Sequence, residues 1–250
     1  MKVLLINLDR SPERLSQIKQ QLDPIGISFE RISAIDAKKL QESTTNFVKA
    51  PNFEYPYPLT KGEIACFLSH RECWKIAASS NDNWTLILED HALISPHIKE
   101  YIKSTNWIPE ECDLIQLIYT ELPTFTDKTI KININNNTLL RTVFSSPVGA
   151  SAYLISKKAA MIAVKHSIFL RSPADNFLFS PWSTFSKHIA VWRLKKALVR
   201  RNNVESTITG RNKSTKVLTA YRFSIKRIYK KIQSKIHRLF LKKEKQEWQT

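Results

Sequence analysis

Two carboxylates and a histidine follow an apolar run in the middle of the chain. Residues 84–95 read WTLILEDHALIS, so Glu89, Asp90 and His91 stand where a buried strand would end. Clustered carboxylates repel one another and lose solvation when buried, so a positive charge usually offsets them. A divalent cation can do this, bound by carboxylate oxygen and imidazole nitrogen. On these residues alone, a metal or catalytic site and a plain turn or helix cap made by Asp90 both remain open.

A second polar group ends the first apolar run, Lys2–Leu8. Asn7, Asp9 and Arg10 fall at its end, and Arg14 follows one helical turn later. A helix N-terminus with arginines nearby can bind phosphate, because free N–H groups, the helix dipole and guanidinium groups all favour an anion. The alternative is a solvated helix start.

Asp175 and His70 are two further candidates for chemistry. Asp175 follows a proline in the polar stretch SPADN, where it could be a general base beside a pocket or a helix N-cap. The residues alone favour the cap. His70 lies seven residues after Glu63, on one face of a predicted helix, and a single helical histidine is more often a hydrogen-bonded structural residue. Cys66, on the same segment, is expected to pack in the core.

Alternating strands and helices must position these residues. Ser11 and Pro12 predict a helix start, and Thr60 with Glu63 forms a capping-box pattern at a second one. Strands are expected within 2–8, 27–36, 84–90 and 112–119, and a strand that leads into a helix within 151–166. This alternation predicts an α/β fold with a mainly parallel sheet, in which ligands bind beyond the carboxyl ends of the strands.

Composition excludes several classes of protein. The chain has 250 residues and only four glycines, so neither GxGxxG nor GxxxxGK[ST] can be written anywhere in it. The three cysteines have no CxxC spacing and are expected to be reduced thiols in a cytosolic protein. No apolar run approaches the ~18 residues of a membrane span, and the N-terminal apolar stretch is too short for a signal peptide.

The net charge of +17 is concentrated near the end of the chain. Residues 193–250 hold 18 Lys and Arg against three acids. We therefore divide the chain into a domain at 1–205 and a basic amphipathic tail at 206–250. Apolar residues recur in the tail at helical spacing, at Ile225, Ile228, Ile232, Ile236 and Leu239/Phe240. Such a helix favours an anionic membrane surface; packing on the body and nucleic-acid binding are the alternatives, and no nucleic-acid-reading motif is present.

Five segments taken in order resemble glycosyltransferase family 25, the bacterial lipopolysaccharide and lipooligosaccharide glycosyltransferases that include β-1,4-galactosyltransferases. They are INLDRSPER, LTKGEIACFLSHRECW, LILED, SPVGASAYLISKKAA and SPADNFL, spread over about residues 2–180, and VESTITGRN is a further, weaker match. The resemblance implies a GT-A-like, Rossmann-type α/β sandwich. It also implies an inverting transfer of a hexose, galactose or glucose, from a UDP-sugar to a lipid-linked oligosaccharide acceptor. The protein would then be cytoplasmic and peripheral on the inner membrane.

The resemblance also assigns roles to residues. It places the donor near Asn7, Leu8, Asp9, Arg10, Arg14, Lys61, His70, Glu89 and Asp90. Asp175 would lie on the acceptor side as general base, with Asp90 and Glu63 as the other catalytic candidates. Mn²⁺ or Mg²⁺ would bind Glu89, Asp90 and His91.

One departure bears on the metal. The family motif is usually Glu-Asp-Asp, and His91 replaces its last acid. His91 can coordinate Mn²⁺ but supplies no negative charge, so Arg10, Arg14 and Lys61 are the alternative partners of the diphosphate. Two rival classes stay open: a non-catalytic relative that binds a sugar nucleotide, and a nucleic-acid-binding protein acting through the basic tail.

Overall fold

Helices and strands alternate through most of the described chain, as the sequence predicts. The computed structural model describes residues 1–41, 54–55, 57–122, 124–134, 136–144, 149–202 and 242–249. Its helices are α1 (Pro12–Leu22), α2 (Lys61–Ser79), α3 (Ile98–Ile102), α4 (Lys157–His166) and α5 (Ala174–Phe179). Its strands are β1 (Lys2–Asn7), β2 (Glu30–Ser33), β3 (Trp84–Glu89), β4 (Ala92–Ile94), β5 (Leu114–Gln116), β6 (Thr124–Ile134), β7 (Asn137–Phe144), β8 (Ala152–Ser156), β9 (Val191–Leu194), β10 (Lys196–Ala197), β11 (Val199–Arg201), β12 (Lys242–Glu244) and β13 (Glu247–Trp248).

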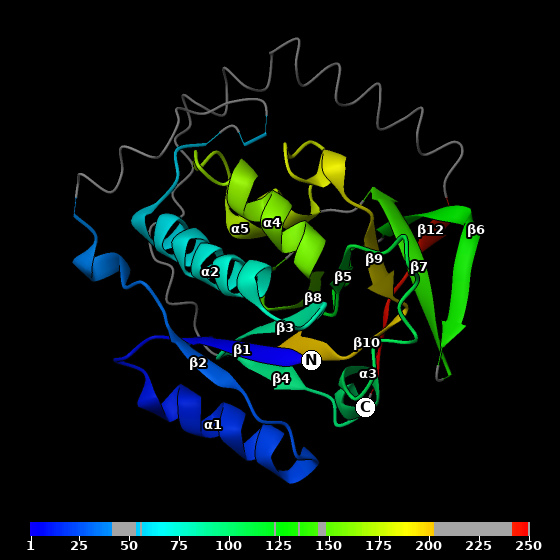
Figure 1. Cartoon of the computed structure of the whole chain (residues 1–250), viewed down its shortest axis with the longest axis horizontal. Helices are drawn as coiled ribbons and strands as arrows, with labels where there is room; N and C mark the ends of the chain where they lie inside the picture. The colour runs from blue at the N-terminus through cyan, green and yellow to red at the C-terminus, as the bar shows by residue number, and fades with distance from the viewer. Residues whose placement is uncertain are drawn as a thin grey trace.

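A central sheet runs through the described residues in the order β12-β6-β7-β9-β5-β8-β3-β1-β2 (Figure 1). Strands β2, β1 and β3 pair in parallel, and so do β5 and β9. Strand β8 runs antiparallel between β3 and β5, and β6, β7 and β12 extend the sheet with antiparallel pairs. The α/β class is confirmed, with parallel pairing confined to part of the sheet. The antiparallel pairs could not be predicted from the sequence, because a buried strand is a plain apolar run whichever way it pairs.

The two faces of the sheet bury two separate cores. Alternate residues of a strand point to opposite faces, so Leu5 and Leu88 pack with Ile18 of α1. Leu4 and Ile87 belong to the other core, with residues of α2, α4 and α5. Figure 1 shows this layering, with α1 on one side of the sheet and α2, α4 and α5 on the other. The candidate site lies at the carboxyl ends of β1 and β3, between α1 and α2.

The predicted start of α2 is confirmed in detail. Thr60 Oγ1 accepts a hydrogen bond from the Glu63 backbone N–H, and the Glu63 carboxylate accepts one from the Thr60 backbone N–H at 2.9 Å. This reciprocal capping box satisfies two N–H groups that a helix start leaves without intrahelical partners. At α1, Ser11 is the N-cap residue but its side chain makes no capping hydrogen bond.

The last described residues differ from the helical tail expected for 206–250. Residues Lys242–Glu244 form β12, which pairs with β6, and Glu247–Trp248 form β13, which pairs with β10. These residues add to the sheet system of the body. The apolar stripe at 225–240 lies outside the described residues. Within the described chain, no helix combines the length and the apolarity needed to cross a membrane.

Candidate active site

The carboxyl ends of β1 and β3 meet at one edge of the sheet, as the parallel pairing requires. The backbone N–H of Asp90 donates to the Ile6 carbonyl, and Asn7 Nδ2 donates to Asp90 Oδ2 at 2.8 Å. Arg14 Nη1 lies 3.6 Å from the other oxygen, Asp90 Oδ1. Asp90 is 9% exposed. The two polar groups recognised at separate strand ends therefore form one site.

A cavity of about 170 Å³ opens at this edge. Most of the predicted site residues line it, namely Leu8, Arg10, Arg14, Glu63, His70, Glu89, Asp90, His91 and Asp175. Asn7, Asp9 and Lys61 are not among its lining residues. Asn7 is buried behind the wall, where it holds Asp90.

Asp9 and Lys61 lie on the surface outside the cavity. Asp9 Oδ1 accepts hydrogen bonds from Arg31 Nη2 at 2.6 Å and from Ser33 Oγ at 2.9 Å. The hydrogen bond from Arg31 is the main cause that lowers the pKa of Asp9. The carboxylate of Asp9 thus links the end of β1 to residues of β2.

Glu89 lies at the end of a chain of hydrogen bonds that begins in the core. Trp74 Nε1 donates to the Tyr153 hydroxyl at 2.8 Å, the hydroxyl lies 2.9 Å from His70 Nδ1, and His70 Nε2 lies 3.0 Å from Glu89 Oε1. His70 is fully buried, and burial raises the pKa of Tyr153, which keeps the phenol protonated. With Nε2 protonated, every donor in the chain has an acceptor. His70 is the hydrogen-bonded residue that its sequence predicts, and it also lines the cavity.

Two histidines hold Glu89 ionised. Burial alone would raise the pKa of Glu89, but the charge of His91 and the hydrogen bond from His70 oppose it and lower the pKa to about 2. His91 Nδ1 lies 3.3 Å from Glu89 Oε2. The Arg201 side chain lowers this pKa further.

Both ring nitrogens of His91 lie near other side chains of the protein, although the residue lines the cavity. Its Nε2 lies 2.9 Å from Ser151 Oγ, while its Nδ1 lies 3.3 Å from Glu89 and 4.0 Å from Asp90 Oδ1. Glu89, Asp90 and His91 do not bring one ligand atom each within 4.8 Å of one another. As they lie, these three side chains do not fit a bound cation, and the metal dependence of the protein stays a prediction.

Glu63 and Asp175 differ in what occupies their carboxylates. Both oxygens of Glu63 are engaged at the start of α2, by Thr60 and by the Tyr55 hydroxyl. Asp175, in the first turn of α5, accepts from the backbone N–H groups of Gly149 and Asn176. Asp175 is therefore held by backbone groups on the cavity wall; Pro173, two residues earlier, is the N-cap.

Gly149 is required where it meets Asp175. Its φ of 72° is one that residues with a Cβ rarely adopt, and a Cβ built there would lie 3.2 Å from Ile118 Cδ1. Its carbonyl also accepts from Gln116 Nε2 at 3.2 Å. The turn before β8 thus fixes the position of Asp175.

Sequence reasoning missed two residues that line the cavity, Arg201 and Cys66. Arg201 reaches the cavity because β11 pairs antiparallel with β4, which places Arg201 opposite Ala92 and next to the acidic motif. A local sequence pattern does not predict a pairing between segments so far apart in the chain. Cys66, expected in the core, is only partly buried and lines the cavity; its spacing of four from His70 was the available signal.

We predict that Glu89 contributes pH-dependent stability. Its folded-state pKa of about 2 lies below the ordinary value of 4.5. Its ionised form is therefore favoured by folding, with a contribution that is complete above the unfolded-state pKa and lost as pH falls toward the folded-state value. The difference in unfolding free energy between wild type and Glu89→Gln, measured in urea, should be full at about pH 5 and shrink from about pH 4.5 downward.

Glu72→Gln is the matched control, because Glu72 lies on the outer side of α2 with its side chain 45% exposed. It should change stability little at any pH. A wild-type advantage over Glu89→Gln that persists undiminished to pH 3 would contradict the assignment.

Comparison with known proteins identifies a family and several relatives. A family model described as glycosyltransferase family 25 (LPS biosynthesis protein) matches residues 1–178. A glycosyltransferase 25 family member of Drosophila melanogaster is 36% identical over 107 residues, 40% of this chain and 17% of that protein. The human procollagen galactosyltransferase 2 is 32% identical over 105 residues, again 40% of this chain and 17% of the relative. The matched region spans less than a fifth of the length of these relatives.

Solved structures give a weaker likeness. A glycosyltransferase involved in glycosylation of the major capsid of PBCV-1 aligns with a TM-score of 0.37 and 13% identity, covering 66% of this chain and 64% of that one. The inositol-1-phosphate CTP transferase of T. maritima aligns at 0.40 and 11%, covering 90% and 97%. These TM-scores are too low to support a fold assignment, which therefore depends on the strand order of the chain itself. The family assignment comes from the sequence match over residues 1–178: the chain belongs to glycosyltransferase family 25.

Proposed function

We propose that this chain transfers a hexose from a UDP-sugar to a saccharide acceptor, with inversion at the anomeric carbon. The observation that carries the proposal is one cavity at the carboxyl ends of β1 and β3 that gathers Arg10, Arg14 and Arg201 with Asp90 and Asp175. Cations suit a diphosphate and carboxylates suit sugar hydroxyls. Family membership and the names of the galactosyltransferase relatives favour this reaction, with galactose as the first donor sugar to test.

The arginines are assigned to the donor diphosphate. A nucleoside diphosphate gains negative charge as it leaves, and fixed cations that meet this charge stabilise the transition state. Arg10 is oriented by Asp36, whose Oδ2 lies 2.8 Å from Arg10 Nε, and Arg14 by Asp90. Arg201 comes from a different element, β11. Lys61, the other cation expected from the sequence, lies outside the cavity and is not assigned to the donor.

Asp175 is assigned as the general base. Asp90 is engaged by Asn7 and the Arg14 cation, and Glu63 by the capping box. Asp175 lines the cavity, and its Oδ2 accepts from the Gly149 backbone N–H, which leaves that oxygen a second lone pair for the acceptor hydroxyl. In a single displacement, the acceptor hydroxyl oxygen attacks the anomeric carbon as Asp175 takes its proton. The bond from that carbon to the phosphate oxygen breaks, and the nucleoside diphosphate leaves with the electron pair.

Replacing Asp175 by Asn should therefore lower kcat by about 100-fold or more, since a positioned base contributes 10²–10⁴-fold, while the donor still binds. Steady-state transfer assays and donor titration by calorimetry separate the two effects. Asp82→Asn is the matched control, because Asp82 precedes β3 at the opposite edge of the sheet. A kcat for Asp175→Asn near that of wild type would rule Asp175 out as the base.

The two neighbouring arginines at the end of β11 offer a test of the diphosphate site. Arg201 lines the cavity, whereas Arg200 stacks on Trp248 with its guanidinium carbon 5.1 Å from the ring centroid. Arg201→Gln should weaken UDP binding by about tenfold or more, the size of a charge-assisted hydrogen bond, and Arg200→Gln should leave it unchanged. Equal losses in the two variants would show that general surface charge, not the cavity, attracts the nucleotide.

We extend the proposal to a lipid-linked oligosaccharide acceptor at the cytoplasmic face of a membrane. The support is the family description, which names lipopolysaccharide biosynthesis, and the basic apolar-striped sequence near the end of the chain. An acceptor fixed in a membrane favours an enzyme that binds the same surface.

Exchanging Lys226, Arg227, Lys230 and Lys231 together for Gln should reduce binding to anionic vesicles, because each basic residue near such a surface contributes about 1 kcal/mol. The exchange leaves β12 and β13 intact, which truncation after residue 205 would not. Vesicle co-sedimentation with anionic and with neutral lipids provides the measurement. Unchanged sedimentation of the variant with anionic vesicles would show the membrane role of this segment to be wrong.

A further inference from the structure

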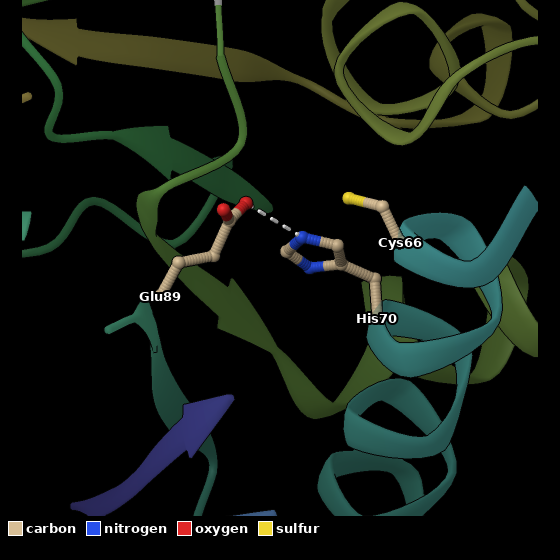
Figure 2. Close-up of side chains that lie close together, drawn as sticks. All are labelled: Cys66, His70 and Glu89. Atoms are coloured by element: carbon tan, nitrogen blue, oxygen red, sulfur yellow. Dashed lines mark hydrogen bonds and ion pairs between the residues drawn. The ribbon is translucent and has the colours of Figure 1, made fainter. Parts of the chain in front are cut away.

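The wall of the cavity between α2 and β3 carries three different metal-binding groups in one place. The Cys66 thiol, the His70 imidazole and the Glu89 carboxylate each offer a ligand atom, and these atoms lie within 4.8 Å of one another. Figure 2 shows Cys66 and His70 on successive turns of α2, with the Glu89 carboxylate facing them from the end of β3. This trio shares only Glu89 with the metal ligands expected from the acidic motif.

We propose that Cys66, His70 and Glu89 form a binding site for a thiophilic divalent cation, with Zn²⁺ as the best match. The donor set carries the choice of ion. Thiolate, imidazole and carboxylate together are typical zinc ligands, whereas Mg²⁺ takes oxygen ligands and keeps much of its water. The proposal concerns binding alone and does not rest on the transfer reaction.

The spacing of the ligand atoms suits such an ion. With bonds of about 2.0–2.3 Å, the ligands of a tetrahedral zinc lie about 3.3–3.8 Å apart. His70 Nε2 and Glu89 Oε1 are 3.0 Å apart, so they need to separate by only a few tenths of an ångström. The thiol lies inside the same 4.8 Å limit.

The elements that carry the ligands are rigid. Cys66 and His70 are four residues apart, so they lie one above the other on one face of α2, a helix of 19 residues with a complete capping box. Glu89 ends β3, a strand paired on both sides. Ligands on a helix and a central strand keep their geometry without a bound ion, which lowers the ordering cost of binding.

A supporting oxygen already lies behind the histidine, where Nδ1–H can donate to it once Nε2 binds the ion. A metal-bound histidine usually donates its other ring N–H to an oxygen, which fixes the ring orientation. His70 Nδ1 lies 2.9 Å from the Tyr153 hydroxyl, which Trp74 holds at 2.8 Å. The cavity supplies the entry path and an open fourth position, because all three ligand residues line it.

Binding must release a proton. Zn²⁺ replaces the thiol proton of Cys66, which passes to solvent. The proton that His70 Nε2 shares with Glu89 moves to Nδ1, which frees the Nε2 lone pair for the ion and keeps the imidazole neutral. Affinity for Zn²⁺ should therefore rise with pH.

The test titrates the full chain, freed of metal by a chelator and kept reduced, with Zn²⁺, Co²⁺, Mn²⁺ and Mg²⁺ in turn. Wild type should bind one Zn²⁺ more tightly than Mn²⁺ by about 100-fold or more, as a thiolate ligand favours, and Co²⁺ should give a sulfur-to-cobalt charge-transfer absorption. Cys66→Ala should abolish that absorption and weaken Zn²⁺ by more than about 100-fold, and Tyr153→Phe should weaken it about tenfold.

Cys112→Ala is the matched control, because Cys112 lies in the other core and should leave both signals unchanged. A second readout uses wild type only. Cys73 and Cys112 are buried, so alkylation of the native protein should report Cys66, and Zn²⁺ should slow it. The proposal is overturned if Cys66→Ala binds Zn²⁺ as wild type does, or if Zn²⁺ leaves the alkylation of Cys66 unchanged.

Discussion

The arrangement of the site depends on one ionised carboxylate at the end of a buried strand. Glu89 follows five buried residues of β3, where an ionised group without partners would be costly. His70 and His91 contact its two oxygens, and each histidine is anchored in turn, by Tyr153 and by Ser151. These contacts tie α2, β3 and β8 together at the edge of the sheet. The residues that keep Glu89 ionised, His70 and His91, also form part of the cavity wall.

His91 makes sense within that constraint. An aspartate at this position would bring a third negative charge beside Glu89 and Asp90, which a cation would have to balance. The histidine instead contacts Glu89 and hydrogen-bonds with Ser151. Arg10, Arg14 and Arg201 line the same cavity, and Arg14 lies 3.6 Å from the Asp90 carboxylate.

Sequence reasoning predicted the parts of the site that local patterns specify. The capping box of Thr60 and Glu63 and the strand before Glu89 follow from spacing rules, whereas the polar groups at the ends of β1 and β3 were brought together only by the family resemblance. Contacts between distant segments did not follow. Arg201 reaches the cavity only through the pairing of β11 with β4, and Asp175 is fixed by the left-handed turn at Gly149. Asp9 and Lys61 were predicted to bind the donor, but they do not line the cavity. A sequence motif does not specify where each of its side chains points.

The claim that unites these observations is that the cavity at the ends of β1 and β3 binds a nucleotide-sugar. Hydrogen–deuterium exchange of the full chain, with and without UDP-galactose or UDP-glucose, tests it most directly because it reports where a ligand binds. The account predicts slower exchange in residues 8–14, 62–70, 89–91 and 149–151, with the amino ends of the same strands unchanged. Protection confined to residues 203–241, or no protection with any UDP-sugar, would contradict it.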